Sequence, residues 1–338
     1  MGPSPQTCQD QIKRIIATTL RNNPGAPSDG RPVSEENLEP RAPTSQKRGT
    51  LFREGMTLTF GFIGNRPDVG HWIAKSQKES LSLSAEPGGA VAFGIGFFQA
   101  DEVLLRRRPA DPRATVDLSA ELGDIRGHAL LSQLRNVHHG ELTTESTPPL
   151  RFGHLLFACD GEFPDAVALR PLVQARLPAF LRPLLGQGTF PELVLGLFLA
   201  KIPQPHLERS RDVSAARGTL GAAQIRNGIR AALGELTRIA DEAKVSPFVG
   251  DIWICSGEEL VIGHRSGPLY LRVFRSRREL MNLGEVPPSS AAPGSDLTQA
   301  FGVVGGQFPA GEGWERLPDQ TMLTLTRSAA PEVEALGC

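Results

Sequence analysis

Alternation between hydrophobic and polar positions starts abruptly at residue 56. Residues 57–63 alternate as in a half-buried strand and run into Gly64-Asn65-Arg66-Pro67, a turn sequence. Further segments rich in β-branched or large apolar residues predict strands at 90–98, 102–106, 128–134 and 155–158. Their short spacing is typical of antiparallel sheets.

Helical periodicity replaces this alternation in the middle of the chain. Helices are predicted over 166–185, 193–200 and 220–243, and the last of them has an apolar face. Strands return at 248–254, 260–263, 269–274 and 321–326, while a Pro-, Ser- and Ala-rich stretch at 286–295 predicts a surface loop. The order of strands, helices and strands favours an α+β fold, with helices packed on two antiparallel sheets.

The first 55 residues differ from the rest in composition. They hold seven prolines among mostly polar residues and have one short apolar patch. Such a segment cannot bury enough apolar surface to offset its ordering entropy, so we expect a disordered or loosely attached extension. The sequence therefore predicts one domain at 56–327, followed by a tail at 328–338.

The charge balance argues against several classes of function. The chain has 36 Lys+Arg against 37 Asp+Glu, a formal net charge of −1, whereas nucleic-acid binders and polybasic membrane-surface proteins need a positive field. The apolar stretch at 193–202 is about half as long as a membrane-spanning helix. The start of the chain lacks the apolar core of a secretory signal. We therefore expect a cytoplasmic protein that binds neither nucleic acid nor membrane.

Neither a metal nor a cofactor is expected. The four cysteines show no CxxC pairing, and no GxGxxG or GxxxxGK[ST] sequence follows a predicted strand. His138 and His139 would point to opposite faces of an extended stretch, so together with His154 and Cys159 they do not predict a zinc site. Cys159 is expected to be a small packed residue, and Arg106-Arg107-Arg108 a solvated strand end.

A series of short patterns follows the chain order of one known family. They are Met56-Thr57-Leu58-Thr59-Phe60-Gly61, Phe93-Gly94-Ile95-Gly96-Phe97-Phe98, Gln133-Leu134-Arg135, Glu145-Ser146-Thr147-Pro148-Pro149-Leu150, Phe157-Ala158-Cys159-Asp160-Gly161 and Gly188-Thr189-Phe190-Pro191-Glu192. In that order they resemble the opening strand, the Gly-rich strand, the His-x-Arg strand, the Glu-Asn-x-His-Pro-Phe loop, the Phe-x-His-Asn-Gly strand and the Thr-Asp-Ser-Glu helix start of class II glutamine amidotransferases. Gly313-Trp314-Glu315-Arg316-Leu317-Pro318 is similar to the closing segment of a bacterial subgroup that includes the ergothioneine-pathway γ-glutamyl amidohydrolase.

The resemblance covers about residues 56–327. It implies the four-layer αββα fold of the N-terminal-nucleophile hydrolase superfamily, with two antiparallel sheets. Thr57 falls at the position of the family's nucleophilic Cys, Arg135 at that of the Arg that binds the substrate carboxylate, and Gly161 at that of the oxyanion-binding Gly. Asp160 replaces the oxyanion-binding Asn, and Phe190 replaces the Asp that binds the substrate ammonium group.

These replacements change the chemistry that the site could perform. A carboxylate at Asp160 cannot donate to a developing oxyanion unless it is protonated, and losing one neutral donor raises the barrier by about 3–4 kcal/mol. Phe190 removes the countercharge that recognises a free amino acid. Thr57 becomes a nucleophile only with a free α-amine, which a start at Met56 or cleavage after Met56 would supply.

We therefore predict a degenerate glutaminase site in a protein that is non-catalytic or altered in activity. Through Arg135 it would serve as a scaffold or sensor for a small γ-glutamyl or carboxylate ligand, or it would act with a biosynthetic partner protein. The enzyme alternative is a γ-glutamyl-type amide or peptide hydrolase with Thr57 as nucleophile and base. A purely structural interaction module is the third class that stays open. The first two alternatives need Thr57, Arg135 and Asp160 in one shared crevice.

Overall fold

The computed structural model describes residues 56–99, 102–138, 141–162, 166–184, 186, 188–202, 220–281, 283, 297–308 and 311–337. The predicted extension at 1–55, the predicted loop at 286–295 and His139 lie outside the described residues. The described residues all belong to one compact unit, Gly55–Cys338.

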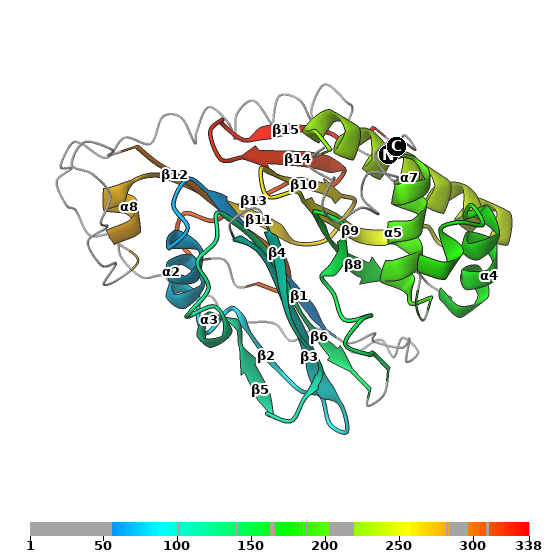
Figure 1. Ribbon diagram of the computed structural model, residues 1–338, viewed down its shortest axis with the longest axis horizontal. Coiled ribbons are helices and arrows are strands. Elements are labelled where there is room, and N and C mark those ends of the chain that lie inside the picture. The colour runs from blue at the N-terminus through cyan, green and yellow to red at the C-terminus, as the bar shows by residue number, and fades with distance from the viewer. Residues whose placement is uncertain are drawn as a thin grey trace, which may run out of the picture. The chain divides into compact units, whose positions relative to one another are not determined.

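Two antiparallel sheets are built from strands that are distant in sequence (Figure 1). In the first sheet the described strands lie in the order β13-β11-β12-β1-β6-β3-β4, which are Glu315–Arg316, Leu269–Ser276, Leu297–Gly306, Thr57–Gly64, Ala129–Val137, Ala90–Gln99 and Glu102–Asp111. In the second sheet the order is β15-β14-β10-β9-β8-β7, which are Glu332–Ala335, Thr321–Thr326, Glu259–His264, Val249–Cys255, Leu155–Glu162 and Leu150–Phe152. A small pair joins β2, Ser82–Ser84, to β5, Thr115–Asp117.

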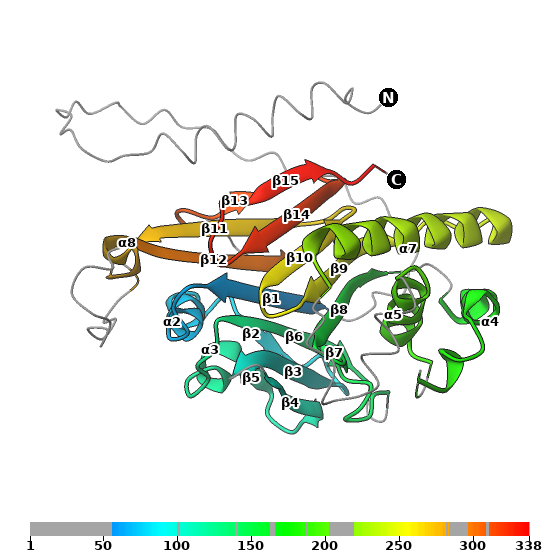
Figure 2. The same cartoon turned by 45° about the horizontal axis from the view of Figure 1, so that its top comes forward.

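Helices cover the outer face of each sheet (Figure 2). On the first sheet lie α2 (Val69–Ser76), α3 (Leu118–Glu121) and α8 (Arg277–Met281). On the second sheet lie α4 (Ala166–Arg176), a 3₁₀ turn (Arg182–Leu184), α5 (Phe190–Ala200) and α7 (Ala222–Ala243). The described chain therefore has the four layers αββα that the sequence resemblance implied.

Period-two alternation sends each strand's side chains to two different cores. In β1, Phe60 and Phe62 pack with the helices of the first sheet, whereas Ile63 packs in the core between the two sheets. In β8, Phe157 packs against the helices of the second sheet, and Leu156 faces the first sheet. The central strands of each sheet are thus buried on both faces, so β1 is not the half-buried strand that its alternation predicted.

Local sequence signals fix the ends of the helices. The backbone N–H of Thr189 donates to Glu192 at 2.7 Å, so the start of α5 is capped. Helix α4 stops at Arg176 rather than continuing to residue 185 as predicted, since Pro178 disfavours helical backbone at the residue before it. Residues 332–335, which the sequence analysis placed in a tail, pair with β14 as strand β15.

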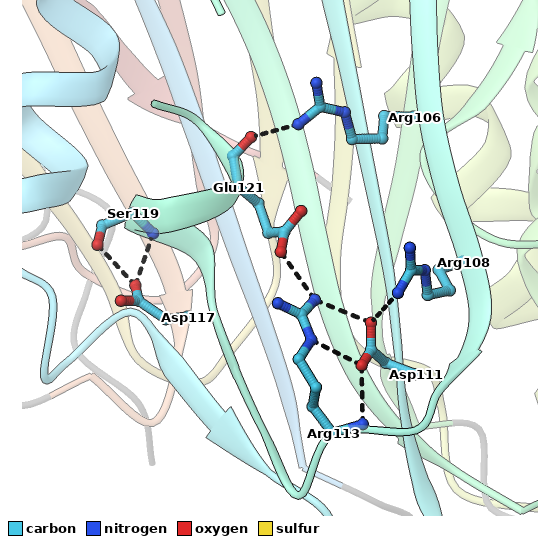
Figure 3. A network of polar contacts seen from close by, with 7 residues as sticks. All are labelled: Arg106, Arg108, Asp111, Arg113, Asp117, Ser119 and Glu121. Carbon is cyan, nitrogen blue, oxygen red and sulfur yellow. Dashed lines mark hydrogen bonds and ion pairs between the residues drawn. The ribbon is translucent and has the colours of Figure 1, made fainter. Parts of the chain in front are cut away.

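Arg106, Arg107 and Arg108 lie inside β4 rather than at a solvated strand end, because this strand continues to Asp111. Figure 3 shows the network that surrounds the Asp111 carboxylate, which accepts from Arg113 Nε at 2.8 Å and Arg108 Nη1 at 3.1 Å. Hydrogen bonds from Arg113 lower the pKa of Asp111 to about 2. This ion network joins the end of β4 to α3, because Arg113 also pairs with Glu121 at 2.7 Å.

Candidate functional site

The core between the two sheets changes from apolar to polar at one end. Six strands place every second side chain in this core. On each of them these side chains are apolar along most of the strand and polar near one end. We call this cluster the polar end, and its members are Thr57, Thr59, Gln133, Arg135, Asp160, Asp251, His264 and Thr321. Strand register brings them together, since Thr57 pairs with Arg135, Asp160 with Asp251, and His264 with both Asp251 and Thr321.

Direct hydrogen bonds connect the two sheets at the polar end. The side-chain amide of Gln133 donates to Thr59 Oγ1 at 2.9 Å and to the Cys159 carbonyl at 3.3 Å. Thr59 Oγ1 in turn donates to Asp160 Oδ2 at 3.4 Å. Gln133 is 2% exposed, and its Oε1 has no hydrogen-bond partner among the described atoms. A buried amide oxygen in this state is a ready acceptor for a ligand donor.

Arg135 is the cation of the polar end. It is half-buried, its Nε is buried without a hydrogen-bond acceptor, and no described residue forms an ion pair with its guanidinium. Burial and the charge of Asp160 raise the pKa of the neighbouring Cys159 thiol, and the charge of Arg135 opposes that rise. Arg135 and Asp160 therefore lie in one electrostatic neighbourhood. The structure brings Thr57, Arg135 and Asp160 together, as the sequence analysis expected.

Gly161 lies inside β8, next to Asp160. Its φ is +141°, and a Cβ there would lie 2.2 Å from the Val249 carbonyl oxygen. Gly250, directly opposite on β9, has a φ of +142°, and its Cβ would lie 2.1 Å from the Asp160 carbonyl oxygen. Two glycines are needed here because the backbones of β8 and β9 approach closely beside Asp160.

Phe190 is the first residue of α5, and its ring lies against Phe248 with 5.8 Å between ring centroids. Phe248 precedes β9 and therefore stands two positions before Gly250. Phe190 packs against the core between the second sheet and its helices, so it presents an apolar ring at this position. Its expected role in substrate binding stays a prediction.

Asp251 and His264 belong to the polar end but were missed by the sequence analysis. His264 Nδ1 lies 2.6 Å from Asp251 Oδ1, and His264 Nε2 lies 3.6 Å from the half-exposed Asp319 carboxylate. Burial raises the pKa of Asp251, and the hydrogen bond with His264 opposes that rise. The signal that could have revealed them is alternation, because both continue the inter-sheet face of their strands.

Cys159 and Cys255 are buried, and burial raises the pKa of both thiols. Cys159 packs in the helix-side core, as a small apolar residue would. Within the described ranges no group of three His, Cys, Asp or Glu residues is arranged to hold a metal ion. Among the described helices, none combines the length and apolar character needed to cross a membrane.

Comparison with known proteins identifies the fold. No protein-family model matches the chain, and no curated protein sequence matches it. Among solved structures, a glutamine aminotransferase class-II domain protein from Silicibacter pomeroyi matches with a TM-score of 0.50 at 15% identity, over 82% of this chain and 99% of that chain. The chain has the fold of a class II glutamine amidotransferase domain.

Two further structures match less well. Glutamine phosphoribosylpyrophosphate amidotransferase from B. subtilis has a TM-score of 0.46 at 13% identity, over 82% of this chain and 49% of that one. A predicted glutamine amidotransferase from Pseudomonas aeruginosa PA01 has a TM-score of 0.47 at 15% identity, over 83% of this chain and 96% of that one. At such identities the class II amidotransferase fold says nothing about chemistry, which has to be argued from the polar end itself.

Proposed function

We propose that this chain is a class II glutamine amidotransferase-like protein whose polar end binds a small carboxylate ligand and which lacks ordinary glutaminase activity. The observation that carries the proposal is the Arg135 guanidinium, which is half-buried and has no ion-pair partner among the described residues. Such a cation is a strong site for a carboxylate, because guanidinium and carboxylate groups form paired, charge-assisted hydrogen bonds.

Three features argue against glutamine hydrolysis. Thr57 lies in β1 and follows Met56, whose carbonyl accepts from the Asn136 N–H at 3.0 Å, so a free α-amine at Thr57 would require cleavage after Met56. An ionised Asp160 would repel an oxyanion. Phe190 offers an apolar ring where the related family has an Asp for the substrate ammonium group. The ligand that these residues favour has a carboxylate and no neighbouring ammonium group.

Binding measurements test this proposal. Isothermal titration calorimetry of the full chain would compare glutaramate, which is glutamine without its α-amino group, with L-glutamine and with the uncharged diamide glutaramide. We expect glutaramate to bind best. Arg135→Gln should weaken its binding at least about tenfold, since a charge-assisted pair is lost. Arg327→Gln is the matched control, because Arg327 pairs with Glu258 away from the polar end. Equal binding of glutaramide and glutaramate would contradict the proposal.

A second candidate is the γ-glutamyl-type amide or peptide hydrolase. It is favoured by the position of Thr57, which starts β1 in register with Arg135, directly after Met56, a residue 42% exposed. A mature chain that begins at Thr57 would carry the free α-amine as base, with Gly161 as oxyanion donor and Arg135 as carboxylate clamp. The intact mass of natively produced protein tests this candidate. A mass that includes Met56 eliminates it.

Two narrower proposals rest on the sequence resemblance. The chain would belong near the bacterial subgroup that its segment at 313–318 resembles. In this chain, Trp314 of that segment is 8% exposed and packs edge-on against Phe308. It would also act with a biosynthetic partner protein. Co-purification of one stoichiometric partner from the native source, reduced by substitutions on the surface and unaffected by Arg135→Gln, would support the second proposal.

A further inference from the structure

Arg107 on β4 holds the segment 142–149 to the first sheet. Its Nε donates to the Pro149 carbonyl oxygen at 3.1 Å. Its Nη1 donates to the carbonyl oxygens of Glu145 at 3.2 Å and Thr144 at 3.3 Å. All hydrogen bonds of this half-buried guanidinium with described residues go to main-chain carbonyls of one segment, so Arg107 fixes the path of that backbone.

The held segment lies on the face of the first sheet that carries Arg135. Gly94 on β3 is in register with Arg107, and a Cβ at Gly94 would lie 2.1 Å from the Pro148 carbonyl oxygen. The segment therefore crosses β3 at a position that has room only for glycine. Gly94 is also in register with Gln133 of the polar end, and residues in register share a face of the sheet.

Near its start, the segment packs beside Arg135 itself. Leu142 packs against a small apolar cluster that contains Ala92 and Val137. Ala92 on β3 is in register with Arg135 on β6, and Val137 is two positions further along β6, on the same face. The segment 142–149 therefore covers the surface that adjoins Arg135 on the side of β3.

We propose that Arg107 is a positioning residue for the ligand of Arg135, because it holds the segment 142–149 as one wall of the crevice around that guanidinium. This inference rests on the proposed function, since it needs a ligand at Arg135. Thr57 of β1 is in register with Arg135, so it borders the crevice on the side opposite to the segment. A wall that is fixed before the ligand arrives loses little conformational entropy on binding. Arg107 therefore strengthens binding through the backbone that it holds, without touching the ligand.

Isothermal titration calorimetry of the full chain with glutaramate tests this role. Arg107→Gln should weaken binding at least about fivefold, because the wall loses the donors that fix it. Arg107→Lys should recover part of this loss, since an ammonium group can still donate to carbonyl oxygens.

Arg151→Gln is the matched control for these titrations. Arg151 Nη1 donates to the Val103 carbonyl of β4 at 3.0 Å, so it is also an arginine that binds a main-chain carbonyl, but outside the segment 142–149. Burial and the charge of Arg151 lower the pKa of Arg107, so the two cations lie in one neighbourhood. The control therefore also accounts for the loss of one positive charge, and it should leave glutaramate binding unchanged.

Amide hydrogen exchange of the segment gives a readout that a merely structural role would not move. The Thr147 N–H donates to the Thr143 carbonyl at 3.0 Å inside the segment. Saturating glutaramate should slow exchange of this amide in the unsubstituted chain by a larger factor than it slows exchange in the edge strand β15. Should Arg107→Gln fail to fold, Leu142→Ala replaces it, because it loosens the same wall while the Arg107 contacts remain, and it should also weaken glutaramate binding.

The outcomes separate this inference from the function on which it rests. Glutaramate binding that depends on Arg135 but is equally strong in Arg107→Gln would overturn the positioning role and leave the proposed function standing. Exchange in the segment that glutaramate does not slow, or an Arg151→Gln chain that loses as much affinity as Arg107→Gln, would overturn it as well. If no form of the protein binds glutaramate, the proposed function fails and the positioning role fails with it.

Discussion

Two regions of this protein bury carboxylates in opposite ways. Asp111 accepts from two arginines and a backbone N–H, and the network in Figure 3 holds acids and bases in paired contacts. At the polar end, Asp160 and Asp251 oppose each other, and Arg135 has no ion-pair partner among the described residues. The first arrangement stabilises the fold by itself, whereas in the second the Arg135 guanidinium is available to a bound anion. This difference in charge pairing is why we propose a binding role for the polar end and a structural role for the Asp111 network.

The largest expected effect comes from replacing three residues with those that class II glutamine amidotransferases have at the corresponding positions. Thr57→Cys, Asp160→Asn and Phe190→Asp, combined in a chain that starts at Met56, should supply the nucleophile, the oxyanion donor and the ammonium partner. We expect glutamine hydrolysis at least about a hundredfold above the same chain without the substitutions, measured as glutamate released.

Two controls belong with this experiment. Adding Arg135→Gln to the rebuilt chain should raise KM for glutamine far more than it lowers kcat, because Arg135 would bind the carboxylate in both ground and transition states. Circular dichroism and thermal unfolding establish that the shortened chain folds. A folded, rebuilt chain without glutaminase activity would show that Thr57, Asp160 and Phe190 were assigned to the wrong positions.

The next effect breaks the Asp111 network. Asp111→Asn leaves Arg108 and Arg113 without their carboxylate, and we expect the free energy of unfolding to fall by about 1–2 kcal/mol at pH 7 because both arginines are half-exposed. The pKa of Asp111 is lowered to about 2, chiefly by hydrogen bonds from Arg113. The ionised form is therefore favoured in the folded state, so its contribution is present above the unfolded-state pKa and disappears as the pH falls towards the folded-state value.

Urea unfolding at a series of pH values from neutral to acid measures this contribution. The difference between the unsubstituted chain and Asp111→Asn should be constant near neutrality and shrink in the acid range. Asp251 has the opposite sign, because burial raises its pKa, and the resulting penalty grows as the pH rises through its folded-state pKa. A difference for Asp111→Asn that grows on acidification would mean that the arginine contacts do not stabilise the fold.

Part of the fold and part of the polar end could be predicted from the sequence. Alternation predicted β1, apolar composition predicted β6 as far as Leu134, and the motif order brought Thr57, Arg135 and Asp160 to one place. Strand β12 was missed because its glycines weaken the strand signal. The structure explains these glycines, since a Cβ at Gly305 would lie 2.8 Å from the Trp253 ring and one at Gly302 would lie 3.1 Å from the Trp314 ring.

The sequence could not predict which polar side chains lie next to one another on neighbouring strands, for a different reason. A polar residue at a strand position is compatible with either face of the strand until the register is known. Asp251 and Asp160 become neighbours only through the pairing of β9 with β8, and His264 reaches Asp251 only through the pairing of β10 with β9. No local pattern carries that information. The fold and the proximity of Thr57, Arg135 and Asp160 were therefore within reach of the sequence, whereas the positions of Asp251 and His264 beside them were not.

The smallest expected effect is the most discriminating. Asp160→Asn should change the free energy of unfolding at pH 7 by less than about 1 kcal/mol, because Asp160 is half-buried and the amide oxygen can still accept from Thr59. Asp111→Asn in the same urea titration is the reference for a carboxylate whose partners stabilise the fold. If Asp160→Asn destabilises the chain as much as Asp111→Asn does, then Asp160 is a structural anion, and the polar end should be regarded as part of the core rather than as a place for a ligand.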